Sequence, residues 1–484
     1  MGEFRVSVIK EEVVAAMLPM QDHWLPFSNL DLLLPPIDAS VFFCYNNTAM
    51  LSFGSMVESL KNSLAKALVP YYAFGGEVVQ NSMGEPELLC NNRGVDFVVA
   101  EADVELQSLN LYNPDESVEG KLVPKKKRGV LAVTWLKCGG LVVGCTSDHR
   151  IADAYSTNIF LVSWAQLAQS TGLTTLTHQP CFRRSLLSPR RPPTIHPSAS
   201  IDRMYVLLTD HLPPPAEPNP SSDPGPIISR IYFITVEELN RIQALATSNG
   251  AKPTKLVSFS AFLWKLVATA SVSSKAIIDG NLQLTIHQKR NIYKIRYNNK
   301  KAIVAKMGVV VDGRRRLSNG DKKKEALMNC YFGNVVSIPF DGEPVEKLVE
   351  KTLSQVAEQV HEFLEVATTE EHFLGLNDWV EIHRPVPAVT RIFHETYDGP
   401  CFVVSSGRRF LESKVDFGWG KPIFESCHFP WGGRCGYVMP LPSPKGNGDW
   451  VLYMHLHKNH LEFMESHYSH IFRPLSWDYL SNQI

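Results

Sequence analysis

The pattern of apolar and polar residues is most regular in the stretch LVVGCTSDHRIADAYSTNIFLVSWAQLAQ, residues 141–169. An apolar run at 141–145 predicts a strand, and the polar residues 146–148 predict a turn after it. The residues from 154 to 169 are mostly apolar, and this longer run predicts a helix. The stretch therefore predicts a strand, a turn and a helix in that order.

His149 and Asp153 stand between the predicted strand and the predicted helix. A side chain at such a turn can meet a substrate while rigid elements fix its backbone, and Asp153 occupies the usual place of an N-cap. The spacing alone is weak, because about one chance match is expected at ordinary aspartate frequency among 16 histidines. A second copy, His394 and Asp398, lies in the loop-like HETYDGP. From these residues alone, His149 is equally well a catalytic base or a histidine satisfied at a strand end.

A proline-rich segment divides the rest of the chain. Residues 180–226 hold twelve of the 32 prolines. Because proline lacks the backbone donor and fixes its φ angle, we predict a crossover linker here, with a short strand at 204–208 docked within it. Residues 1–179 and 227–484 each mix predicted strands and helices. We therefore predict an α/β protein of two similar-sized domains around mixed sheets, with a pocket where they meet.

The other elements are predicted from the same patterns. Residues 130–136 and 141–145 predict a hairpin, and Thr235 with Glu238 predicts a capping box that starts a helix. Further strands are predicted at 5–13, 41–45, 87–90, 96–100, 227–234, 282–286, 309–311, 335–338, 402–405 and 451–456, and helices at 56–68, 254–270 and 345–366.

Composition and charge exclude several classes of partner. The 484 residues are 44% hydrophobic and carry a net charge of −1, which is globular and gives no indication of nucleic acid as a partner. The nine cysteines contain no C-x-x-C pair, so we expect no metal site and no disulfide framework, but reduced thiols in a cytoplasmic protein. No apolar run reaches about 18 residues, so no membrane span is expected. We expect a monomer.

Other enzyme classes lack their motifs. The chain has no G-x-S-x-G elbow, no Walker lysine loop and no G-x-G-x-x-G. Cys145 lies four residues before His149, but a catalytic thiol needs its partner in space and not in sequence. The short basic runs 125–128, 314–316 and 322–324 are most simply solvated faces, although one of them could hold the phosphates of a nucleotide-like donor.

Six motifs together resemble one family. In DFGWG, residues 416–420, two glycines on either side of a tryptophan indicate a constrained backbone. Together with HRIAD, this motif makes the chain resemble the BAHD acyltransferases, plant-type enzymes that move an acyl group from coenzyme A to an alcohol or an amine. Four further motifs look like that family in the same order: FSNLD at 27–31, VSFSAFLWK at 257–265, VVDGRRRL at 310–317 and YFGNVV at 331–336.

The resemblance covers nearly the whole chain. It implies a chloramphenicol-acetyltransferase-like pair of domains with an active-site channel at their interface. Acyl-CoA would be the co-substrate, and no cofactor would be permanently bound. Because a thioester is already activated, the reaction needs a base and a stabilised carbonyl oxygen rather than a covalent nucleophile.

The resemblance also implies roles for single residues. His149 would be the general base, since imidazole has a reference pKa near working pH. The chemistry of the reaction, and not the resemblance, suggests that the indole N–H of Trp419 donates to the developing oxyanion. Asp153 and Asp416 would brace the site. The implied arginine partners are Arg314 and Arg316, and the implied contacts of coenzyme A are Lys252 and Ser258.

Two departures from the family pattern bear on the acceptor. Asp148 and Ala154 replace a histidine and a glycine that the motif often has, and we expect Asp148 to face water. Relatives often carry Ser-Trp before DFGWG, where this chain has VVSSGRRFL, and that loop lines the acceptor side in relatives. Ser405, Ser406 and Gly407 are therefore acceptor-pocket candidates, because losing the bulky tryptophan leaves Gly407 and a more open wall.

The SSGRRF form looks most like enzymes that act on phenylpropanoid alcohols such as coniferyl alcohol. We therefore expect a neutral aromatic or allylic alcohol as acceptor and an acetyl or small aromatic acyl donor. The alternatives are an amine, polyamine or hydroxy acid acceptor, and a small-molecule binder without catalysis.

Overall fold

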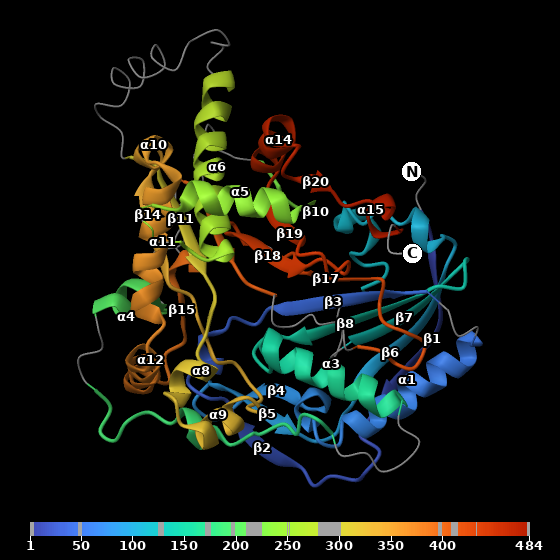
Figure 1. The fold of residues 1–484 in the computed structure, drawn as a ribbon. Helices are drawn as coiled ribbons and strands as arrows, with labels where there is room; N and C mark the ends of the chain where they lie inside the picture. Colours follow the sequence, from blue (N-terminus) through green and yellow to red (C-terminus); the bar gives the residue numbers. More distant parts are fainter. Residues whose placement is uncertain are drawn as a thin grey trace.

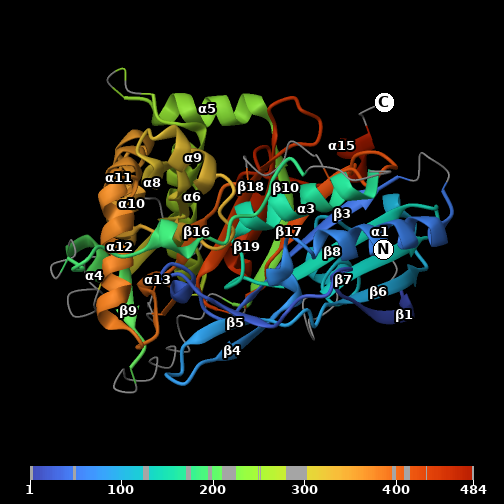
Figure 2. The same cartoon turned by 90° about the horizontal axis from the view of Figure 1, so that it is seen from below.

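Two large mixed β-sheets carry the fold, and helices cover both of them (Figures 1 and 2). The computed structural model describes residues 4–46, 51–123, 130–169, 176–194, 199–209, 225–248, 250, 252–278, 302–394, 399–407, 415–431 and 433–481.

The first sheet has six strands and supports the HRIAD segment. Only β6 and β7 pair in parallel, and β7 and β8 form the predicted hairpin. Helices α1 (Phe53–Ala67) and α3 (Ala154–Gln169) pack on one face, where residues such as Trp164 and Phe97 are completely buried. The strand order is β1 (Val6–Val14), β6 (Val95–Ala102), β7 (Val130–Leu136), β8 (Leu141–Asp148), β3 (Asp38–Tyr45) and β17 (Phe424–His428).

The second sheet has seven strands and its own apolar core, centred on α6 (Lys255–Ile278). The flanking helices include α5 (Val236–Ala246), α10 (Val345–Glu350), α11 (Leu353–Ala367) and α14 (Lys458–His467). The strand order is β14 (Phe340–Pro344), β11 (Val304–Val309), β16 (Cys401–Val404), β18 (Gly436–Pro442), β19 (Trp450–His457), β10 (Ile227–Ile234) and β20 (Arg473–Pro474).

Smaller elements join the two sheets. They form the sheet β2 (His23–Pro26), β5 (Pro86–Cys90) and β4 (Glu77–Gln80), and the pairs β9 (Tyr205–Leu207) with β15 (Ala388–Thr390) and β12 (Val311–Asp312) with β13 (Val336–Ser337). The remaining helices are α2 (Pro114–Ser117), α4 (Ala199–Met204), α8 (Arg314–Ser318), α9 (Lys322–Met328), α12 (Glu370–His383), α13 (Arg391–His394) and α15 (Trp477–Ser481).

The C-terminal half completes the first sheet, which the predicted division did not anticipate. Strand β17 pairs antiparallel with β3, so the predicted segment 227–484 does not contain all of its own strands. The predicted linker 180–226 is also more structured than its prolines suggested. It contributes α4 and the predicted short strand, β9, and it buries Ile201 and Tyr205 in a shared apolar cluster. The two halves are therefore interlocked.

Two helices of the second half differ from their predictions. The single helix predicted at 345–366 is two helices, because Thr352 starts α11 with a capping box to Gln355. Helix α6 contains a window, Lys255–Val272, long and apolar enough to cross a membrane, and 56% of that window is buried inside the protein. Such burial is what a core helix shows. The strand predicted at 282–286 lies outside the described residues.

Candidate active site

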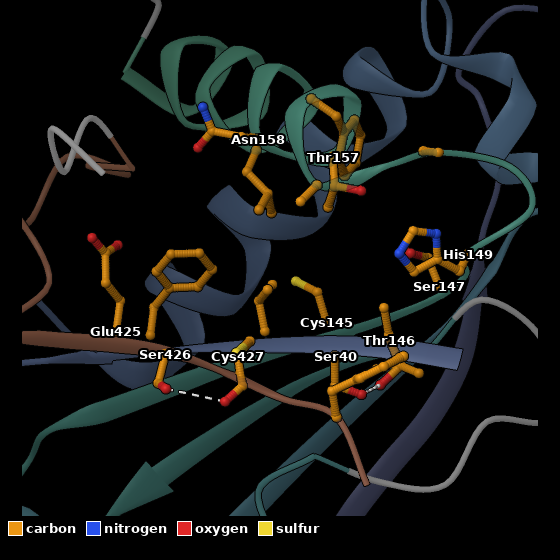
Figure 3. Close-up of a pocket in the computed structure, with 18 of the residues that line it drawn as sticks. Ser40, Cys145, Thr146, Ser147, His149, Thr157, Asn158, Glu425, Ser426 and Cys427 are labelled. Atoms are coloured by element: carbon orange, nitrogen blue, oxygen red, sulfur yellow. Dashed lines mark hydrogen bonds between the residues drawn. The ribbon is translucent and has the colours of Figure 1, made fainter. Parts of the chain in front are cut away.

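His149 lies directly after β8 and four residues before Asp153, at the edge of a cavity (Figure 3). Its backbone N–H donates to the carbonyl oxygen of Ile37 at 2.9 Å, which ties the turn to the start of β3. The buried Nδ1 atom of its ring has no hydrogen-bond partner among the described residues. The ring lies 6.3 Å from the ring of Phe429, centre to centre. The backbone of His149 is thus fixed by its hydrogen bond to Ile37, and its imidazole faces the cavity.

Asp153 forms a buried ion pair with Arg314. Both arginine nitrogens bind the carboxylate, at 2.7 and 3.1 Å, and both side chains are almost fully buried. The backbone N–H of Ser156 donates to Asp153 at 2.9 Å, so Asp153 caps α3 as predicted. Burial opposes ionisation of Asp153, but the charge of Arg314 and these hydrogen bonds outweigh it and hold the pKa of the carboxyl below its usual value. The pair locks the start of α3 to α8.

Asn334 fixes the His149 turn from the other side, and sequence reasoning did not single it out. Its Nδ2 atom donates to the carbonyl oxygens of His149 and Arg150, both at 3.0 Å. The fully buried Asp31 accepts from the Asn334 backbone at 2.7 Å and from its side chain at 3.0 Å. The motifs FSNLD and YFGNVV therefore meet beside the HRIAD segment. The presence of all three motifs in the sequence was the signal that could have indicated Asn334.

Asp148 does not face water, contrary to the prediction. Arg150 binds its carboxylate with two guanidinium nitrogens, at 3.0 and 2.6 Å, and Asp148 is only 8% exposed. The prediction that Asp148 faces water left out Arg150, the cation two residues along the chain. This ion pair stiffens the residues on both sides of His149.

The cavity lies between the two sheets. Its walls are β3, β8 and β17 of the first sheet, helix α3, and β18 of the second sheet, and its volume is about 170 Å³. Most lining residues are apolar, among them Val41, Phe43, Phe160, Met439 and Leu441, and no lysine or arginine occurs among the described lining residues. Figure 3 shows His149 at one end of the cavity and Glu425 at the other. A small, largely apolar molecule fits this site.

Trp419 does not line this cavity, so the predicted oxyanion role is wrong in this structure. The indole is 3% exposed and packs in the core beside Tyr45 and Phe417. Helix α3 explains the separation: it has 16 residues and is about 24 Å long, with His149 before its first turn and DFGWG beside its last residue, Gln169. The motif therefore braces the far end of α3.

Among the described residues, Asp416 acts as a local brace for its own turn. Its carboxylate accepts from the backbone N–H groups of Gly418 at 2.8 Å and Gly420 at 3.0 Å, and no ion pair of Asp416 occurs among the described residues. The predicted arginine partners lie elsewhere, since Arg314 binds Asp153 and Arg316 is exposed. Both glycines have φ near +106°, a conformation that other residues rarely adopt.

This geometry predicts a graded effect of substitutions at Asp416. Asp416→Ala removes the acceptor of two backbone hydrogen bonds and should lower the free energy of unfolding by about 1–3 kcal/mol. Asp416→Asn keeps an acceptor oxygen and should recover most of that loss. Thermal unfolding of the three proteins checks this. An asparagine variant as unstable as the alanine variant would indicate that the charge of Asp416 is what matters.

The two predicted coenzyme A contacts, Lys252 and Ser258, differ in their exposure. Lys252 is exposed just before α6. Ser258 is completely buried, and its hydroxyl donates at 2.9 Å to the carbonyl oxygen of Thr254, the residue before α6. It has no surface to offer a ligand in this structure, so that prediction is wrong here. Serine at such a position satisfies its hydroxyl inside its own helix.

The predicted acceptor residues Ser405, Ser406 and Gly407 do not line the cavity. They follow β16 and pack against the neighbouring strand β18, where Gly407 donates to the carbonyl oxygen of Pro440 at 3.0 Å. A Cβ atom at Gly407 would lie 2.2 Å from the side chain of Leu441, so Gly407 leaves no open wall. Leu441 itself lines the cavity. The predicted acceptor residues follow β16, whereas residues of the neighbouring strand β18 line the cavity.

The glutamate in the cavity gives a prediction about stability. Burial raises the pKa of Glu425 to about 8, whereas an unfolded glutamate titrates near 4.3. Between these pH values the folded protein keeps a proton that the unfolded chain has lost, so rising pH favours unfolding. We expect the melting temperature of the protein to fall from pH 5 to pH 8 relative to that of Glu425→Gln. Parallel curves for the two proteins would contradict this.

The neighbouring thiols should not contribute to the difference in melting temperature between the two proteins. Burial raises the pKa of the Cys145 thiol to about 12, and it also raises that of Cys427. Both therefore stay neutral over this pH range.

Comparison with known proteins first supports the fold. Vinorine synthase superimposes with a TM-score of 0.66 at 20% identity, covering 97% of this chain and 99% of that structure. The F. graminearum TRI101 structure with coenzyme A and T-2 mycotoxin has a TM-score of 0.69 at 12% identity, covering 93% and 98%. The two-domain α/β fold is thus a known architecture.

The sequence comparisons define the family. The Transferase family model matches residues 4–471. The hydroxycinnamoyltransferase of Narcissus pseudonarcissus is 27% identical, over 94% of this chain and 97% of the relative. The shikimate O-hydroxycinnamoyltransferase of Nicotiana tabacum is 26% identical, over 93% and 96%. The chain belongs to this transferase family, the BAHD acyltransferases, which take their acyl groups from coenzyme A thioesters. The resemblance predicted from the motifs is confirmed.

Proposed function

We propose that this enzyme transfers an aromatic acyl group from its coenzyme A thioester to the hydroxyl group of a small neutral alcohol, with His149 as general base. The observation that carries the proposal is the imidazole of His149 at the wall of an apolar cavity between the two sheets. The sequence relatives support the donor, since several are named as hydroxycinnamoyltransferases.

The proposed reaction is a direct transfer. The imidazole of His149 takes the proton of the acceptor hydroxyl while the hydroxyl oxygen attacks the thioester carbonyl. The carbon–sulfur bond then breaks, and the imidazolium returns the proton to the departing thiolate. Cys145 is an unsuitable rival nucleophile, because burial raises its pKa to about 12 and keeps it a neutral thiol.

The charges of the cavity support a neutral acceptor. A carboxylate in an apolar site needs a cation to offset its desolvation. No lysine or arginine is among the described residues that line the cavity, and Arg408 and Arg409 lie outside the described residues. Hydroxy acids are therefore the weaker candidates. We further propose action as a monomer, and a cytoplasmic location from the cysteine pattern.

Release of free thiol from acyl-CoA tests the proposal. Hydroxycinnamoyl-, benzoyl- and acetyl-CoA should each be combined with coniferyl alcohol, shikimate and a polyamine. We expect the fastest turnover with an aromatic donor and the neutral alcohol. A clear preference for shikimate or the polyamine would overturn the acceptor assignment. Absence of thiol release with every pair would favour a binder without catalysis.

A further inference from the structure

Glu425 occupies the end of the cavity opposite His149 (Figure 3). It lies on β17 and pairs in register with Phe43 of β3. Alternation along the strand places Glu425, Cys427 and Phe429 on the cavity face and turns His428 to the other face, where it is buried. The carboxyl group therefore projects into the same space as the imidazole.

Among the described residues, this carboxyl group has no partner that accounts for its position. Its Oε2 atom is buried and has no hydrogen-bond partner among the described residues. No lysine or arginine among the described residues lines the cavity with it. Burying a polar group without a partner costs free energy, and buried polar groups that persist usually have one. The missing partner is most simply part of the bound substrate.

The strand sets the distance between the two ends of the cavity. The ring of Phe429 lies 6.3 Å from that of His149, centre to centre. Glu425 is four residues earlier on the same chain segment, which is about 13 Å for an extended backbone. A molecule with one aromatic ring and a short side chain has the scale of this span.

We propose that Glu425 selects substrates by hydrogen bonding to a hydroxyl group at the far end of their aromatic ring. The inference rests on the proposed function and adds to it the feature of the substrate that is recognised. The hydroxyl belongs either to the aromatic acyl group or to the acceptor alcohol, since both chemistries present the same group.

The protonation of Glu425 favours a hydroxyl partner over an ammonium. Burial raises the pKa of Glu425 to about 8, so near neutral pH the carboxyl group mostly keeps its proton. It can then both donate and accept, and a phenolic hydroxyl does the same. An ammonium ligand would require an ionised carboxylate and the burial of two charges, whose desolvation offsets much of their attraction.

The test compares substrates that differ by one ring hydroxyl. The donor pair is 4-hydroxycinnamoyl-CoA and cinnamoyl-CoA, and the acceptor pair is coniferyl alcohol and its analogue without the ring hydroxyl. We expect the wild-type enzyme to prefer the hydroxylated member of one pair by about tenfold or more in kcat/KM, as a hydrogen bond to a buried polar group suggests. Glu425→Met should abolish that preference, and Glu425→Gln should keep part of it. The pair that responds identifies the source of the hydroxyl.

Cys427→Ala is the matched control, because it alters the same face of β17 without touching the carboxyl group. It should change kcat/KM for both members of a pair by the same factor. A preference that survives in Glu425→Met, or its absence from the wild type in both pairs, overturns the inference. A preference for an amine acceptor that Glu425→Met removes also overturns it. If the wild type releases no thiol with any donor, the proposed function fails instead.

The stability of the variants keeps the test interpretable. Removing a buried polar group that has no partner should leave Glu425→Met at least as stable as the wild type. A lower melting temperature would show that Glu425 has a structural role and would contradict its assignment to the substrate.

Discussion

Replacing His149 by alanine is expected to lower kcat/KM by about 10²–10⁴-fold, the usual contribution of a general base. The fold should survive, because the buried Nδ1 atom of His149 makes no hydrogen bond with the described residues. The backbone N–H that binds Ile37 remains in the variant. Thiol release and thermal unfolding, measured on the same preparation, separate the two effects.

His394→Ala is the control for this prediction. His394 has the same spacing to an aspartate, but it ends α13 and does not line the cavity. It should keep most of the activity. Equal losses in the two variants would mean that the strand, turn and helix around His149 have no special role.

Asp153→Ala is expected to have the largest effect on stability. It leaves the guanidinium of Arg314, itself only 2% exposed, with only its longer carboxylate contact, to Asp312 at 3.4 Å, and breaking such a buried pair typically costs about 3–5 kcal/mol. The start of α3 also loses its cap. Because His149 lies in the same turn, activity should fall with stability. Thermal unfolding and thiol release together measure both.

Arg316→Ala is the matched control on α8. Arg316 is exposed two residues beyond Arg314, so its removal should change the free energy of unfolding by no more than about 0.5 kcal/mol. The double variant Asp153→Leu with Arg314→Met should be more stable than the sum of the single losses predicts, since neither half of the buried Asp153–Arg314 pair is left uncompensated. Additive losses would show that the two side chains do not act as a pair.

The sequence was sufficient where structure is local. Helix α3 has the predicted bounds because its apolar run is long and unbroken, and Asp153 caps it because the cap and the helix are neighbours in the chain. The motif resemblance supplied Arg314 but not its partner. That choice depends on how α8 packs against α3, which no local pattern contains.

The misplaced residues depended on long-range geometry. The glycines around Trp419 correctly indicated a constrained ring, but its place is set by the length of α3, which separates it from His149. Strand β17 was not predicted, because its sequence FESCH mixes polar and apolar residues on both faces. Its pairing with β3 joins distant parts of the chain and brings Glu425 into the cavity. Position in the sheet, rather than residue type, made Glu425 a candidate.

The most direct test of the account is the time course of thiol release after rapid mixing of enzyme with aromatic acyl-CoA, with and without the acceptor alcohol. Direct transfer assisted by His149 predicts thiol release that depends on the acceptor, with no initial burst in its absence. A burst of one thiol per enzyme without acceptor would instead reveal an acyl-enzyme, with the cavity-lining Cys145 as the thiol closest to His149 in the sequence. That result would contradict the account.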